Sequence, residues 1–143
     1  MTSPIVTIIV PIYNGERHLR ETVDSLLSQS FGTFELLAID DGSTDASSKV
    51  VQSFKDDRIR LIRKENGGLC DTLNLGIREA KSQFIARNDQ DDISTPQRLE
   101  RQLKVMSENP DAIGLFSYNT KIGSRHTWSN ADKLSMAGDN VRA

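Results

Sequence analysis

A continuous apolar run near the start of the chain is the feature that most restricts its fold. The segment Ile5-Val6-Thr7-Ile8-Ile9-Val10 is rich in β-branched residues and has almost no polar side chain. Such a strand is typical of parallel sheets, because helices cover both faces of these sheets and bury the strand on both sides. The run ends at Pro11, and Tyr13-Asn14-Gly15 follows as a turn. The segment therefore predicts a buried strand of a parallel sheet.

Strands and helices alternate along the rest of the chain. Further strands are predicted at 34–39, 58–63, 84–87 and 112–118, and the charged–apolar alternation of 58–63 favours an edge strand. The order βαβαβαβαβ predicts an α/β fold with a Rossmann-like, doubly wound, mostly parallel sheet and helices on both faces. The expected inner stripes of the helices are Leu19, Val23, Leu26 and Leu27; Val50, Val51 and Phe54; Leu69, Leu73, Ile77 and Ala80; and Leu99, Leu103 and Met106.

Local signals predict where the later helices begin. Ser43 or Thr44 is expected to cap the second helix, and Thr95 is expected to cap the fourth, with Pro96 at its first position.

From residue 123 the alternation of strands and helices fails, so residues 123–143 are predicted to be an irregular tail.

Length and charge exclude several classes of protein. A chain of 143 residues is long enough for one domain with its own core. Its net charge of −2 gives no basic field that would attract nucleic acid or an anionic membrane. No apolar stretch approaches the ~18 residues that a transmembrane helix needs, and no signal peptide is visible. A cytoplasmic protein is therefore expected, with peripheral association at the inner face of the membrane as an option.

Three polar clusters follow three of the predicted strands. They lie at residues 11–14, 40–45 and 89–92. In open α/β sheets, ligands bind outside the carboxyl ends of the strands, where the strand order reverses. If the first and fourth strands are neighbours, all three clusters line one crevice.

The third cluster is the most acidic part of the chain. Asp89, Asp91 and Asp92 place three carboxylates within four residues, directly after the strand Phe84–Arg87. Like charges this close repel one another and need either water or a cation. A divalent metal that holds a diphosphate is one interpretation, and a solvated turn that caps the next helix is the other.

The residue types suggest how a nucleotide could be held. Asp41 can accept a hydrogen bond from a ring N–H of a base, and Tyr13 offers an aromatic face to that base. Asp89 can accept hydrogen bonds from ribose hydroxyls, and Asp91 can bind a hard cation through oxygen. Magnesium prefers one or two protein carboxylates, with phosphates and water completing its shell.

Each of these residues also has a purely structural interpretation. Asp40, Asp41 or Asp45 could cap the second helix, and Asp92 could favour the start of the fourth. Tyr13 could belong to the core, and Arg87 could simply neutralise the acidic cluster.

Four motifs together resemble family 2 glycosyltransferases of the GT-A fold. They match in order and spacing, from about Ile5 to Ile122, and they are Val10-Pro11-Ile12-Tyr13-Asn14-Gly15-Glu16, Ile39-Asp40-Asp41-Gly42-Ser43-Thr44-Asp45, Asn66-Gly67-Gly68-Leu69 and Ala86-Arg87-Asn88-Asp89-Gln90-Asp91-Asp92. The resemblance implies an inverting, metal-dependent transferase that moves a sugar from a nucleotide diphosphate, most often a UDP-sugar, to a saccharide or lipid-linked acceptor. Among bacterial relatives the usual setting is polysaccharide biosynthesis.

The resemblance also implies roles for individual residues. Pro11, Tyr13 and Asp41 would surround the base. Asp89 and Asp91 would form the D-x-D motif, with Asp91 as the ligand of Mg²⁺ or Mn²⁺ and Asp89 near the ribose. Leu73 stands where many members carry an arginine, so one nucleotide contact could be missing.

The resemblance assigns the chain's two parts different roles. Residues 1–122 would form the nucleotide-sugar-binding half, and the acceptor-binding half with the catalytic base would lie beyond them. Because only residues 123–143 follow, the catalytic base is unknown. The alternative function is a non-catalytic fragment or subunit that binds a nucleotide sugar.

Overall fold

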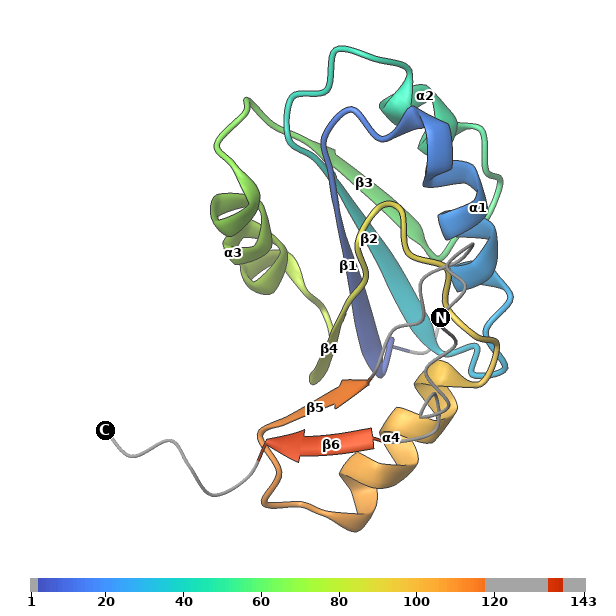
Figure 1. Ribbon diagram of the computed structural model, residues 1–143, viewed down its shortest axis with the longest axis vertical. Helices are drawn as coiled ribbons and strands as arrows, with labels where there is room; N and C mark the ends of the chain where they lie inside the picture. The colour runs from blue at the N-terminus through green and yellow to red at the C-terminus, as the bar shows by residue number, and fades with distance from the viewer. Residues whose placement is uncertain (1–2, 118–133, 138–143) are drawn as a thin grey trace, which may run out of the picture. The chain divides into compact units, whose positions relative to one another are not determined.

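The computed structural model describes residues 3–117 and the backbone of residues 134–137. Its main sheet has four parallel strands in the order β3-β2-β1-β4 (Figure 1). They are β1 (Val6–Ile12), β2 (Phe34–Asp40), β3 (Ile59–Arg63) and β4 (Phe84–Arg87). Every residue of β1 and β2 is buried, which confirms the double-sided burial predicted for the first strand, and β3 lies at an edge as predicted.

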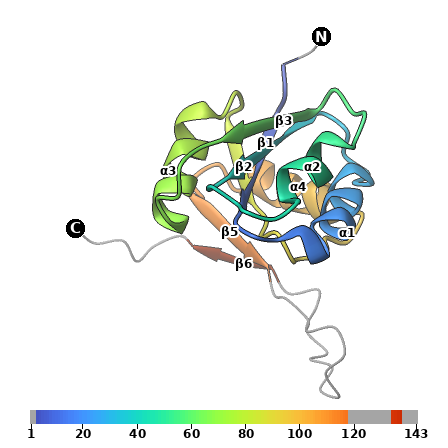
Figure 2. The same cartoon turned by 90° about the horizontal axis from the view of Figure 1, so that it is seen from above.

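Helices cover both faces of this sheet, as predicted. The helices α1 (Glu16–Leu27) and α2 (Ser47–Gln52) lie on one face, and α3 (Leu69–Glu79) lies on the other (Figures 1 and 2). Alternate residues of a strand point to opposite faces. Ile9, Leu37 and Ile39 therefore form a buried cluster that packs with half-buried residues of α3.

The helix α3 buries only part of the predicted stripe, because Leu73 packs against the buried cluster but two other members do not. Leu69 and Ile77 are about half exposed, whereas Thr72 and Gly76 are buried. A Cβ atom added to Gly76 would lie 2.7 Å from Cγ2 of Ile9. The helix thus packs against the sheet through its small residues. A pattern of apolar residues in the sequence does not reveal this kind of close approach.

The prediction that Ser43 or Thr44 caps the second helix is wrong, whereas the alternative, Asp45, accepts the Ser47 amide at 2.9 Å. The helix α2 begins at Ser47, and its N-cap residue, Ala46, has no side chain that could cap it. Ser43 and Thr44 instead bind the loop after β1: the Ser43 hydroxyl accepts the Asn14 amide at 3.0 Å, and the Thr44 amide donates to Oδ1 of Asn14 at 2.9 Å.

The chain divides into two compact units, residues 1–98 and 99–143. The helix α4 (Arg98–Glu108) begins two residues after Pro96, because Thr95 and Pro96 belong to the preceding turn. The strand β5 (Gly114–Ser117) pairs antiparallel with β6 (Leu134–Ala137) in a sheet of its own, not in the parallel sheet. The stretch expected to be irregular therefore contains a strand. None of the helices in the described part of the chain is long and apolar enough to span a membrane.

Candidate functional site

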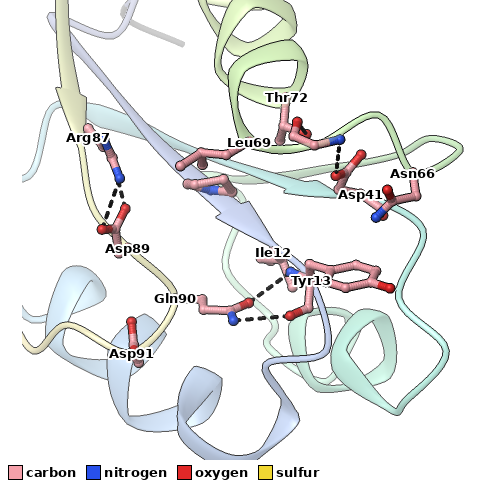
Figure 3. Close-up of a pocket in the computed structure, with 12 residues that line it drawn as sticks. Ile12, Tyr13, Asp41, Asn66, Leu69, Thr72, Arg87, Asp89, Gln90 and Asp91 are labelled. Carbon is pink, nitrogen blue, oxygen red and sulfur yellow. Dashed lines mark hydrogen bonds and ion pairs between the residues drawn. The ribbon is translucent and has the colours of Figure 1, made fainter.

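The carboxyl ends of β1, β2 and β4 surround one cavity of about 460 Å³ (Figure 3). The strands β1 and β4 are neighbours, so the strand order reverses there and the three polar clusters converge as expected. All five residues predicted to bind a nucleotide sugar line this cavity. The complete lining is Pro11, Ile12, Tyr13, Asp41, Asn66, Gly68, Leu69, Thr72, Arg87, Asp89, Gln90 and Asp91.

Tyr13 follows β1 and is held by Gln90, a residue that the sequence did not single out. The Tyr13 amide donates to Oε1 of Gln90 at 2.8 Å, and Nε2 of Gln90 donates to the Tyr13 carbonyl at 3.1 Å (Figure 3). Tyr13 itself is 51% exposed, so the interpretation as a core residue is wrong. Gly15 leaves room for this pairing, because a Cβ atom there would lie 2.3 Å from Oε1 of Gln90.

Asp41 is buried and organises the loop before α3. Its Oδ1 accepts the Gly67 amide at 2.8 Å and Nζ of Lys64 at 2.5 Å, and its Oδ2 accepts the Gly68 amide at 2.8 Å. These amides belong to the two residues that precede α3. Asp41 therefore fixes the loop that leads into α3 and does not cap α2. A carboxylate can accept about four hydrogen bonds, so Oδ2 retains the capacity for one more donor.

Hydrogen bonds stabilise the negative charge of the Asp41 carboxylate. Burial alone would raise the pKa of its carboxyl group, but the hydrogen bonds from Lys64, Gly67 and Gly68 outweigh burial and hold the pKa below its ordinary value. The hydrogen bonds to Asp41 and Asp71 raise the pKa of Lys64 in turn. The carboxylate thus stays ionised and can accept a ring N–H.

Amide side chains anchor the acidic loop after β4. Nδ2 of Asn88 donates to the carbonyls of Asp89 and Asp92 at 2.9 and 3.0 Å. Oδ1 of the same side chain accepts Nη1 of Arg98 at 2.5 Å and the Ser94 hydroxyl at 2.8 Å. Asn88 is only 3% exposed, so its buried amide fixes the course of the loop.

The carboxylates alternate with these amide anchors. Asp89 and Asp91 line the cavity, whereas the Asp92 carboxyl group is not part of its lining. Burial and the charges of Asp89 and Asp91 raise the pKa of Asp92. Asp89 forms a two-point ion pair with Arg87, with distances of 2.8 Å to Nε and 3.0 Å to Nη2.

The side chains that could hold a metal are the carboxylates on the cavity wall. Among the described residues, no three His, Cys, Asp or Glu side chains cluster as a protein-only metal site requires. One or two carboxylates open to a cavity suit Mg²⁺ or Mn²⁺ when phosphates supply the other oxygens. The donor set at Asp91 therefore fits a hard cation bound together with a diphosphate.

Several residues that shape the site were missed by sequence reasoning. Gln90 and Lys64 act through hydrogen bonds to distant parts of the chain, Tyr13 and Asp41. Asn88 and Arg98 act through hydrogen bonds within the loop after β4. Gln90 and Asn88 did carry a signal, because each is a neutral amide next to the acids of the third cluster.

The model of the Glycosyl transferase family 2 domain matches residues 7–140. The chain belongs to glycosyltransferase family 2. An uncharacterised glycosyltransferase of Rickettsia prowazekii is 36% identical over 118 residues, which are 81% of this chain and 37% of that protein. Glycosyltransferase GlyG of Streptococcus pneumoniae is 34% identical over 119 residues, 81% of this chain and 40% of that protein.

Solved structures share the fold of this family 2 chain. TarS of S. aureus, residues 1–349 in complex with UDP-GlcNAc, has a TM-score of 0.76 and 25% identity, over 86% of this chain and 36% of that 1–349 chain. The mannosyltransferase PcManGT of Pyrobaculum calidifontis, in complex with GDP-Man and Mn²⁺, has a TM-score of 0.74 and 25% identity, over 85% of this chain and 37% of that protein. The chain thus spans under half the length of these relatives.

Proposed function

We propose that this family 2 chain binds a nucleotide-diphosphate sugar, most often a UDP-sugar, in the cavity at the ends of β1, β2 and β4. The observation that carries the proposal is the convergence of Tyr13, Asp41, Asp89 and Asp91 on one cavity. Asp41 accepts a ring N–H of the base, Tyr13 packs against the base, with Pro11 beside it, and Asp89 accepts ribose hydroxyls. TarS in complex with UDP-GlcNAc and PcManGT in complex with GDP-Man support the ligand class.

Asp91 is the proposed ligand of a divalent metal. PcManGT in complex with Mn²⁺ supports this assignment. When bound, the metal would stabilise the charge of the departing diphosphate. Asn88 and Gln90 hold the loop through hydrogen bonds to the backbone of Asp89, Asp92 and Tyr13. Asp91 lines the cavity within this loop.

The proposed reaction is transfer of the sugar with inversion to a saccharide or lipid-linked acceptor, in polysaccharide biosynthesis in the cytoplasm or at the inner face of the membrane. The chain spans 37% of the length of the Rickettsia relative. Sugar transfer is therefore proposed in addition to binding of the nucleotide sugar. Binding and transfer therefore need separate measurements.

Calorimetry with UDP, with and without Mn²⁺, tests the binding site. We expect Mn²⁺ to increase the affinity of the wild-type chain for UDP and Asp91→Asn to abolish this increase. Asp57→Asn is the matched control, because Asp57 is an exposed aspartate outside the cavity. Absence of UDP binding, or an undiminished Mn²⁺ effect in Asp91→Asn, would refute the assignment.

Turnover of radiolabelled UDP-sugars distinguishes transfer from binding alone. Release of UDP and labelled acceptor supports the transferase, and the anomeric configuration of the product tests inversion. Metal-dependent UDP binding without turnover, across a panel of sugars and acceptors, would favour the non-catalytic nucleotide-sugar-binding protein.

A further inference from the structure

Arg87 is the only cationic residue among those that line the cavity in the described part of the chain. It is the last residue of β4, and its guanidinium group binds both carboxylate oxygens of Asp89. This parallel, two-point geometry is the most favourable arrangement of an arginine and a carboxylate. The two side chains are 50% and 43% exposed, so their pairing is not forced by burial.

Asp91 has a different environment from Asp89, although the two acids are only two residues apart. Figure 3 shows Asp89 turned toward Arg87, whereas Asp91 lies farther along the loop, beyond Gln90. Gln90 is fixed between them by its two hydrogen bonds to Tyr13. The loop therefore cannot easily bring both carboxylates to one point while these bonds persist.

A cation and Arg87 compete for the same carboxylate. Each oxygen of Asp89 accepts one charge-assisted hydrogen bond from Arg87. The guanidinium charge beside them repels a cation that approaches the remaining lone pairs. We propose that Arg87 is a positioning residue that withholds Asp89 from the metal, so that in the nucleotide-free protein a divalent cation at the cavity wall binds Asp91 and not Asp89.

This inference rests on the proposed function, because it takes Asp91 as the metal ligand. One carboxylate is a weak site for a hard cation, which needs further oxygen ligands. The phosphates of the nucleotide supply these oxygens, so the protein binds the metal mainly together with its ligand. Asp89 is left available at the cavity wall as an acceptor for hydroxyl groups.

The test is the affinity of the nucleotide-free chain for Mn²⁺, measured from the electron paramagnetic resonance signal of unbound Mn²⁺. In Arg87→Met the carboxylate of Asp89 is released toward the metal. We expect the affinity for Mn²⁺ to rise roughly tenfold, equivalent to ~1.4 kcal/mol. Arg87→Gln is a second variant that serves if Arg87→Met folds poorly, and Arg87→Lys should restore part of the wild-type behaviour because it keeps the charge but not the two-point geometry.

Loss of a positive charge attracts cations in any case, so a double mutant is needed. The affinity for Mn²⁺ is compared between Asp89→Asn and the double mutant Asp89→Asn/Arg87→Met. If Arg87 acts through Asp89, the two have the same affinity for Mn²⁺. A gain of the same size in the Asp89→Asn background, or no gain in the single variants, would overturn the proposal. A lower unfolding temperature with unchanged Mn²⁺ affinity would also overturn it, since it would assign Arg87 to loop stability alone.

Failure of this inference is distinguishable from failure of the proposed function. UDP binding by the wild-type chain in the presence of Mn²⁺ supports the function whatever Arg87 does. If the wild-type chain binds UDP with Mn²⁺ and Arg87→Met shows no gain, only the role of Arg87 is wrong.

Discussion

At the scale of single residues, Gly76 shows how a missing side chain can determine packing. It lies in α3, where an added Cβ atom would be 2.7 Å from Cγ2 and 2.9 Å from Cδ1 of Ile9, and 3.0 Å from Cδ1 of Ile39. Both isoleucines are buried, in β1 and β2. The contact sets the distance between α3 and the sheet, and α3 carries Leu69 and Thr72 to the cavity wall.

Gly76→Ala is expected to destabilise the chain despite the higher helix propensity of alanine. The propensity gain is about 1 kcal/mol, whereas overpacking a rigid core costs typically 1–3 kcal/mol. We expect a net loss of up to about 2 kcal/mol in the free energy of unfolding, measured with urea. Gly32→Ala is the matched control, because nothing lies within 4 Å of its added Cβ atom. Equal stability of the two variants would contradict the close approach of α3.

Asp41 should make stability depend on pH in the acid range. Its pKa in the folded chain is lower than its ordinary value of 3.8, so the unfolded chain takes up the proton first as the pH falls. Its contribution is complete well above pH 3.8 and is lost as the pH falls through the folded pKa.

Asp41→Asn removes this contribution. We expect it to lower the free energy of unfolding at pH 7 by about 1.5–3 kcal/mol, the range for hydrogen bonds to charged groups. The difference from wild type should shrink as the pH falls below 3.8. Urea titrations at several pH values measure both effects, with Asp57→Asn as the exposed control. A difference that stays constant with pH would show that the charge of Asp41 is not involved.

At the scale of elements, the loops after β1 and β2 cap each other's helices. The Glu16 amide in the first turn of α1 donates to Oδ2 of Asp45 at 3.1 Å, and the Ala46 amide before α2 donates to Oε2 of Glu16 at 2.7 Å. Asp45 also accepts the amide and hydroxyl of Ser47, so it serves both helices. The two loops are therefore fixed to one another beside the cavity.

These particular contacts separate what the sequence could predict from what it could not. The buried strand at the start of the chain was predictable because burial on both faces leaves a continuous apolar run. The convergence of the three strand ends was predicted on the condition that the first and fourth strands are neighbours, and the pairing of β1 with β4 meets that condition.

Ser43 and Thr44 were predicted wrongly as caps of α2, because a local pattern does not show their bonds to Asn14, whereas the alternative cap, Asp45, does accept the Ser47 amide. The inner stripe of α3 was predicted only in part, because an apolar pattern does not show the close approach at Gly76. For the same reason, Gln90 and Lys64 were not identified.

Gln90 joins the loop after β4 to the end of β1, and its replacement should weaken ligand binding. Gln90→Met keeps the length of the side chain and removes both hydrogen bonds to Tyr13. A loss of about 1–2 kcal/mol corresponds to roughly 5–30-fold weaker UDP binding in the presence of Mn²⁺. Gln83→Met, at an exposed position outside the cavity, is the matched control. Unchanged affinity in Gln90→Met would mean that the loop is fixed without it.

At the scale of the whole molecule, the candidate site exists only when the parallel sheet has formed. Its walls come from the ends of β1, β2 and β4 and from the start of α3, which are far apart along the chain. An unfolded chain cannot bring Tyr13, Asp41 and Asp91 together. A ligand of this cavity binds the native state alone and must stabilise it by mass action.

UDP with Mn²⁺ should therefore raise the unfolding temperature of the chain. At a free ligand concentration about 100 times the dissociation constant, the gain of ~2.7 kcal/mol corresponds to a shift on the order of 5–10 °C for a chain of this size. Differential scanning fluorimetry with UDP, Mn²⁺ and both together measures the shift. We expect the combination to exceed the sum of the separate effects, because the metal and the diphosphate share the site at Asp91.

ADP with Mn²⁺ is the control that isolates recognition of the base. It carries the same diphosphate, but adenine has no ring N–H that could donate a hydrogen bond to Asp41. The oxygen of Asp41 that can accept a further hydrogen bond is Oδ2. A smaller shift with ADP than with UDP is expected in the wild-type chain, and Asp41→Asn should reduce this difference. Equal shifts with ADP and UDP would contradict a base-reading role for Asp41, because the stabilisation would then come from the diphosphate and the metal alone.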